Sequence, residues 1–269
     1  MCSLIVCIDC LCVFFFSDVI KPSFVRKSKK LKKSQSEDTE HVEGSSSFVK
    51  DEGDNLKSIF LRSSPSTFAH VMTEINEDQK KSMHDFGLGS LVGFNIQRLP
   101  GKLTYYVVDA FNPDDMVIRT PRGDIACDRD AVHDVFGLPK GPNDILGFPS
   151  KENSDFVKQW LGQFPKGSSI RKTLVANTIL KTGGTDNIFK MNILMLFANT
   201  MVTSSTNGEF SREVLHHVPI DVDMCTLDWC GYLLKYLKES KNHWDRKSPE
   251  KNYYAGPATF LAVSFSIYS

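Results

Sequence analysis

Apolar residues recur at helical spacing along most of the chain after residue 58. Phe68, Val71, Met72 and Ile75 lie three or four positions apart, which places their side chains on one face of a helix. Three later runs repeat this spacing, with Phe156, Trp160 and Leu161, then Ile170, Leu174 and Ile179, then Cys230, Leu233, Leu234 and Leu237. The pattern predicts a mainly α, irregular helical domain over residues 59–269.

Two further runs are apolar on almost every side. The run that starts at Ile188 and ends at Phe197 follows Asp186, a residue type that caps helix N-termini. A helix without a polar face has to be buried all round, so we expect a central core helix here. The last run, 258–268, follows Pro257, which suits a helix start. Because it is still apolar where the sequence ends, we expect the domain to be truncated at its C-terminus or to lack a partner surface there.

Short polar and glycine motifs separate the helices. Asn76 and Gln79 have the spacing of a capping box, and Gly87 suits the left-handed position after a helix end. Asp128 is placed to cap a helix that ends at Gly137. The apolar stripe of that helix consists of Ala131, Val132, Val135 and Phe136.

The pattern changes near residues 107–126, where a small β-hairpin is predicted. Met116, Ile118 and Ile125 alternate with polar residues on either side of the turn at 121–123. The preceding run, 103–110, is rich in β-branched and aromatic residues. Its periodicity fits both a strand and the end of a buried helix.

Two segments of different composition precede the helical part. Residues 1–20 contain an apolar run, 3–16, that is shorter than the roughly 18 residues of a spanning helix. It also lacks the positive start of a secretory signal, so membrane association is not expected. Residues 21–58 are first basic and then acidic and Ser-rich, a composition that buries too little apolar surface to fold. We interpret residues 21–58 as a disordered linker.

The linker contains the one candidate binding cluster. Lys+Arg and Asp+Glu are equal, at 32 each, so contact with nucleic acid would have to come from a local patch. A dense basic run is typical of a nuclear-localisation signal or of phosphate contact, but also of a merely solvated charge run. The cluster consists of Arg26, Lys27, Lys29, Lys30, Lys32 and Lys33.

Candidate chemistry elsewhere is sparse. His216, His217, Cys225 and Cys230 could be read as zinc ligands, but their spacing is looser than the paired spacing of structural zinc sites. The alternative is that the two histidines lie at a polar helix end and the two cysteines lie in the core. Nucleotide-binding and metalloprotease motifs do not occur in the sequence. No catalytic residue, metal or cofactor is therefore predicted.

Four segments, in order, carry a family resemblance: 64–94, 111–141, 185–202 and 222–240. Together they resemble the plant mobile domain, also called aminotransferase-like, and the most specific part is the hairpin, helix and Gly-Leu-Pro-x-Gly unit at 116–141. The resemblance implies a mainly helical fold related to transposon-derived proteins, some of them nuclear and linked to gene silencing or genome maintenance. The family often precedes ubiquitin-like (SUMO-specific) cysteine protease modules.

The resemblance leads to two functional hypotheses. The first is a non-enzymatic, mobile-element-derived scaffold or interaction domain in the nucleus, with a protein partner or with nucleic acid at the basic run, and without a small-molecule substrate. The alternative is the non-catalytic N-terminal region of a SUMO-type protease whose catalytic module is missing from this chain.

The name aminotransferase-like implies no transaminase chemistry here, because we can nominate no Schiff-base lysine. A protease needs a cysteine activated by histidine. His133 precedes Cys225 and Cys230, but neither cysteine lies in a glycine-rich context.

Overall fold

The computed structural model describes residues 59–61, 64–203, 210–245, 247 and 253–269. The apolar segment 1–20, the linker 21–58 and the basic cluster within it lie outside the described residues. The described residues all belong to the predicted helical domain, residues 59–269.

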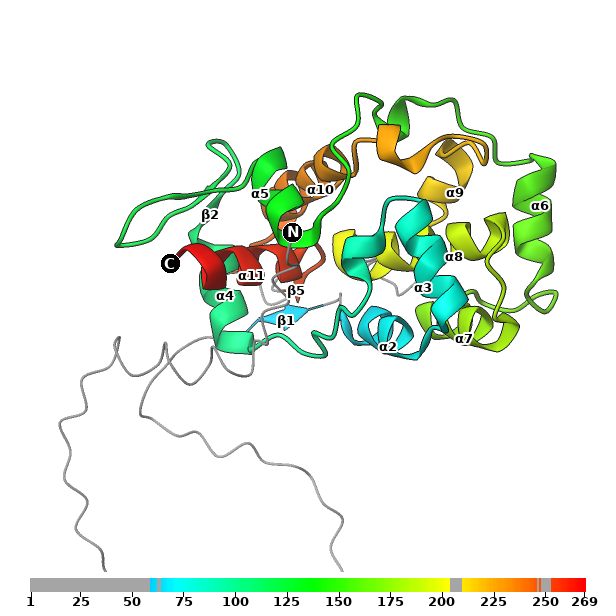
Figure 1. The fold of residues 1–269 in the computed structure, drawn as a ribbon. Helices are drawn as coiled ribbons and strands as arrows, with labels where there is room; N and C mark the ends of the chain where they lie inside the picture. The colour runs from blue at the N-terminus through cyan, green and yellow to red at the C-terminus, as the bar shows by residue number, and fades with distance from the viewer. Residues whose placement is uncertain (1–58, 62–63, 204–209, 246, 248–252) are drawn as a thin grey trace, which may run out of the picture. The chain divides into compact units, whose positions relative to one another are not determined.

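The domain is mostly helical, as predicted (Figure 1). The α-helices are α2 (Ser66–Glu74), α3 (Glu77–Asp85), α4 (Gly101–Ala110), α5 (Arg129–Phe136), α6 (Asp155–Gly162), α7 (Lys172–Thr182), α8 (Asn187–Phe197), α9 (Glu213–His217), α10 (Trp229–His243) and α11 (Ala258–Tyr268). Short 3-10 turns are η1 (Gly89–Leu91), η2 (Ile145–Gly147) and η4 (Met224–Thr226), and a π-helical turn, η3 (Ala198–Val202), extends α8. The described residues contain no helix of the length and apolarity needed to cross a membrane.

Among the described residues, five strands of two residues each form two small sheets. β2 (Phe111–Asn112), β3 (Val117–Ile118) and β4 (Ile125–Ala126) are antiparallel, with Ile118 opposite both Phe111 and Ile125. β1 (Phe60–Leu61) pairs in parallel with β5 (Tyr253–Tyr254). The predicted hairpin is confirmed and has a third strand, while residues 107–110 belong to α4.

The ambiguous run 103–110 is thus the helix α4. It buries Thr104, Val107 and Val108 on one face, at helical spacing. The Lys241 ammonium, from α10, donates to the carbonyl oxygens of Val108 (2.5 Å) and Asp109 (3.1 Å). A cation at the last carbonyls of a helix satisfies acceptors that have no partner within the helix. This long-range cap could not be read from the local pattern.

Helix α8 is the core helix that its sequence predicts. Its residues from Met191 to Phe197 are all buried, and α7 and α9 pack against it. Phe197 contacts Phe68 of α2 and Trp229 of α10 edge-on, with ring centroids 5.7 and 6.2 Å apart. The apolar faces of α2 and α10 therefore meet at α8.

Most predicted caps are present. Asn76 and Gln79 form the capping box, with backbone-to-side-chain distances of 2.9 and 3.1 Å. The Gln79 amide, itself buried, also donates to the carbonyls of Ile179 and Gly184. Gly87 has a φ of +85°, as its position after α3 predicts. The spacing of capping residues therefore predicts helix ends correctly in this chain.

The apolar faces of α6 and α7 differ from the prediction. α6 buries Val157 and Trp160, and leaves Phe156 and Leu161 partly exposed. α7 buries Val175, Ala176 and Ile179. Trp160 and Ile179 are buried as predicted, and Trp160 packs against Phe164 and Phe210. The prediction missed the smaller buried residues Val157, Val175 and Ala176, because it chose the largest apolar side chains.

Met116 is the one described non-glycine residue with a positive φ, +54°. Its carbonyl accepts a hydrogen bond from the Cys127 N–H (2.8 Å), which holds the turn before β3 in place.

Asparagine tolerates the left-handed region better than methionine does. We expect Met116→Asn to raise the free energy of unfolding by about 0.5–1 kcal/mol, measured by urea denaturation. Met116→Leu keeps the backbone strain and should change the free energy of unfolding little. A clear loss of stability in Met116→Asn would contradict a strained turn.

Candidate functional site at the Gly137–Gly141 turn

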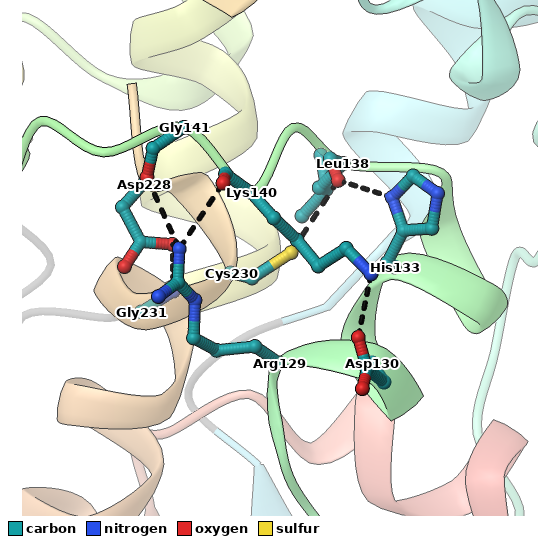
Figure 2. A network of polar contacts seen from close by, with 9 residues as sticks. All are labelled: Arg129, Asp130, His133, Leu138, Lys140, Gly141, Asp228, Cys230 and Gly231. Atoms are coloured by element: carbon teal, nitrogen blue, oxygen red, sulfur yellow. Dashed lines mark hydrogen bonds and ion pairs between the residues drawn. The ribbon is translucent and has the colours of Figure 1, made fainter. Parts of the chain in front are cut away.

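The turn at 137–141 lies between α5 and the start of α10 (Figure 2). Gly137 ends α5 in the left-handed region, with a φ of +64°, and its N–H donates to the His133 carbonyl (2.6 Å). Leu138 is fully buried. The turn then runs beside residues 226–228, where Lys140 and Asp228 form an isolated antiparallel bridge.

Gly141 is required by a close approach of two backbones. Its N–H donates to the Leu227 carbonyl (3.1 Å). A Cβ atom here would lie 2.0 Å from the carbonyl carbon of Thr226 and 2.5 Å from the nitrogen of Leu227. Since backbone atoms cannot move aside as a side-chain end can, only glycine fits without a shift of the chain.

Arg129, the first residue of α5, joins the turn to α10. Its Nη2 donates to the carbonyls of Lys140 and Gly141, both at 3.1 Å, and lies 3.2 Å from Oδ1 of Asp228. Asp228 is the N-cap of α10 and accepts from the Gly231 N–H (2.8 Å). One guanidinium and one carboxylate thus hold two helix starts and the turn between them.

His133 and Cys230 meet at one carbonyl, that of Leu138. The distances to this oxygen are 2.7 Å from His133 Nδ1 and 3.4 Å from Cys230 Sγ (Figure 2). A carbonyl only accepts, so both the imidazole N–H and the thiol S–H donate to it. We call Arg129, His133, Asp228 and Cys230 the clamp, because all four hold the turn or the helix start beside it.

An ion pair on the surface accompanies the clamp. Lys140 Nζ lies 2.5 Å from Oδ1 of Asp130. The hydrogen bond and the charge of Lys140 lower the pKa of Asp130, and the hydrogen bond to Asp130 raises the pKa of Lys140. Both groups face solvent, where such a pair contributes little to stability.

The three cysteines that the structure describes have raised pKa values and are protonated thiols near neutral pH. Burial raises the pKa of both Cys127 and Cys230 to about 12. Cys225 is exposed, and its pKa is also raised, first by desolvation and then by the charge of Asp223. Because the thiolate is the reactive form, these surroundings oppose the activation that a nucleophilic cysteine requires.

Two of the four residues weighed as zinc ligands donate to backbone carbonyls instead. His217, in α9, donates from Nδ1 to the Phe148 carbonyl (2.6 Å), and Cys230 belongs to the clamp. Over the part of the chain that the structure describes, His, Cys, Asp and Glu form no group of three suited to a metal ion.

Sequence reasoning found the glycines of the turn and the cap residues, but it missed the clamp as a unit. Arg129 shows no motif, since its acceptors are two backbone carbonyls and a carboxylate from a distant helix. Asp228 carries a local signal, the N-cap spacing before α10.

The close approach at Gly141 predicts a large cost for any side chain there. We expect Gly141→Ala to lower the free energy of unfolding by roughly 2–3 kcal/mol, because the added Cβ forces the two backbones apart. Gly162→Ala is the matched control, since a Cβ at that helical position meets nothing within 4 Å. The control should be neutral or slightly stabilising. Equal effects of the two substitutions in a denaturation experiment would contradict the close approach.

Burial also predicts the order in which the described thiols react. In the native protein at about pH 8, iodoacetamide should label Cys225 and leave Cys127 and Cys230 unmodified, as read by peptide mass spectrometry. Labelling of Cys225 should rise with pH, because its raised pKa leaves little thiolate at neutral pH. All three should react after unfolding in guanidinium. Native labelling of Cys230 as fast as that of Cys225 would overturn its place in the clamp.

Comparison with known proteins gives one match. A family model described as a domain of unknown function (DUF8566) matches residues 61–262, a range that contains the whole clamp and nearly all of the helical domain. No curated protein and no solved structure matches the chain. Since the match covers well over half of the sequence, the chain belongs to the DUF8566 family.

Proposed function

We propose that this protein is a non-enzymatic interaction scaffold, derived from a mobile element, that works in the nucleus. The observation that carries the proposal is the clamp. Arginine, histidine and cysteine side chains can take part in catalysis or ligand binding, but here Arg129, His133 and Cys230 each donate to the backbone of the turn. This use of reactive side chains to hold a backbone turn supports a structural role for the segment.

The nuclear part of the proposal rests on the basic cluster and on the resemblance to the plant mobile domain. With 32 positive and 32 negative side chains, the chain as a whole does not attract a polyanion. Its partner is a protein that recognises the helical domain, or nucleic acid held by the basic cluster. Gene silencing or genome maintenance is the setting that the resemblance favours.

The proposal is tested by replacing all six residues of the basic cluster with glutamine in the tagged full chain. We expect the nuclear share of the protein, measured by fluorescence microscopy, to fall several-fold, because a nuclear-localisation signal depends on its positive charge. A matched control removes six exposed lysines of the helical domain instead: Lys81, Lys151, Lys166, Lys181, Lys235 and Lys238. Unchanged distribution of the cluster variant, or an equal loss in the control, would contradict a nuclear-localisation role.

The same variants separate import from nucleic-acid contact. If the cluster neutralises up to six phosphates, the logarithm of the binding constant for duplex DNA should fall with the logarithm of salt with a slope of up to about −5. The cluster variant should lose that slope and the control should keep it. A cluster variant that loses import but binds DNA with the original slope would leave the cluster as an import signal alone.

A further inference from the structure

Two tyrosines of α10 share one carboxylate, that of Glu213 at the start of α9. The Tyr232 hydroxyl donates to Glu213 Oε2 (3.2 Å), and the Tyr236 hydroxyl donates to the same oxygen. The two tyrosine rings are in edge contact, with centroids 5.0 Å apart. Tyr232 is buried, whereas Tyr236 is half-buried. A phenol that small reagents can reach therefore lies beside a proton acceptor.

Contacts with the core fix the position of this carboxylate. The Glu213 N–H donates to the Ser211 hydroxyl (3.4 Å). The backbone of Ser211 in turn exchanges two hydrogen bonds with the buried amide of Asn199 in η3, at 2.7 and 3.0 Å. The start of α9 is thus tied to the core on one side and to α10 on the other, so the acceptor is in place before any reaction begins.

A phenol that loses one electron also has to lose its proton. The radical cation of a phenol is a strong acid, so a base already hydrogen-bonded to the hydroxyl makes the electron easier to remove. At Tyr236 the electron passes to the oxidant, the O–H bond breaks, and the proton moves to Glu213 Oε2. The product is a neutral phenoxyl radical beside a neutral carboxylic acid. The Lys235 ammonium, 5.7 Å from the centroid of the Tyr236 ring, would oppose a radical cation but does not oppose a neutral radical.

We infer that Tyr236 is a site of oxidative modification by one-electron oxidants, with Glu213 as the proton acceptor. The inference goes beyond the proposed function and does not depend on it. When nitrogen dioxide is the second reactant, its nitrogen forms a bond to the ring carbon next to the phenolic oxygen. That carbon loses its proton to water and the oxygen regains the proton held by Glu213, which leaves nitrotyrosine. Tyr232 shares the same acceptor but is buried, so it should stay unmodified.

The first test treats the full chain with peroxynitrite in bicarbonate buffer, after its accessible thiols have been blocked with iodoacetamide. This mixture supplies carbonate radical, which takes the electron, and nitrogen dioxide, which bonds to the ring. Tyr106 is the comparison, because it is 40% exposed. Peptide mass spectrometry should find several-fold more nitration at Tyr236 than at Tyr106, although exposure alone favours Tyr106. Equal nitration of the two, or more at Tyr106, would overturn the inference.

The second test removes the proton acceptor. In Glu213→Gln the amide cannot take the proton, so nitration of Tyr236 relative to Tyr106 should fall several-fold. The matched control is Glu239→Gln, because Glu239 is exposed on α10 and acts on Tyr236 through its charge alone. The control should keep the original ratio. Unfolding would raise nitration at every tyrosine, so a selective fall at Tyr236 does not come from a misfolded variant. No fall in Glu213→Gln, or an equal fall in the control, would contradict the role of Glu213.

The third test uses a reagent that requires the phenolate. Burial, and then the hydrogen bond and charge of Glu213, raise the pKa of Tyr236, so little of its phenolate forms at about pH 8. Tetranitromethane, which nitrates tyrosine by way of the phenolate, should therefore modify Tyr106 before Tyr236. A preference for Tyr236 with this reagent as well would show that access to the ring, and not proton transfer to Glu213, selects the site, and would overturn the inference.

Discussion

The burial of α8 on all sides is the constraint on which the rest of the domain depends. A helix without a polar face must be covered completely, and α2, α7, α9 and α10 do so with their own apolar faces. The buried amide of α8, Asn192, must then find its partner within the protein. It exchanges two hydrogen bonds with Gln163, at 2.9 and 3.1 Å, which anchors the segment after α6 to the core.

The features that the sequence predicts well are helix ends, because they depend on hydrogen bonds between residues close together in the chain. The capping box at Asn76, the N-caps Asp128 and Asp186, and the glycines after α3 and α5 all act within four residues, so their spacing suffices. The face of α6 and the helical state of 103–110 depend on partners far along the chain, and the local pattern could not select them. The clamp belongs to this second class, because its donors find backbone carbonyls whose positions only the fold defines.

The clamp has a structural role within the domain. Polar side chains at the Gly137–Gly141 turn are directed inward, at the backbone of the chain itself, and join α5 to the start of α10.

The parallel pair of β1 and β5 has a consequence for how the chain folds. It joins residues 60 and 61 to 253 and 254, so nearly the whole domain forms the loop that this pair closes. Closing so long a loop is entropically unfavourable until the helices between the strands have packed. During synthesis β1 therefore has to wait for almost the entire domain to leave the ribosome, and its few hydrogen bonds should be the last to form.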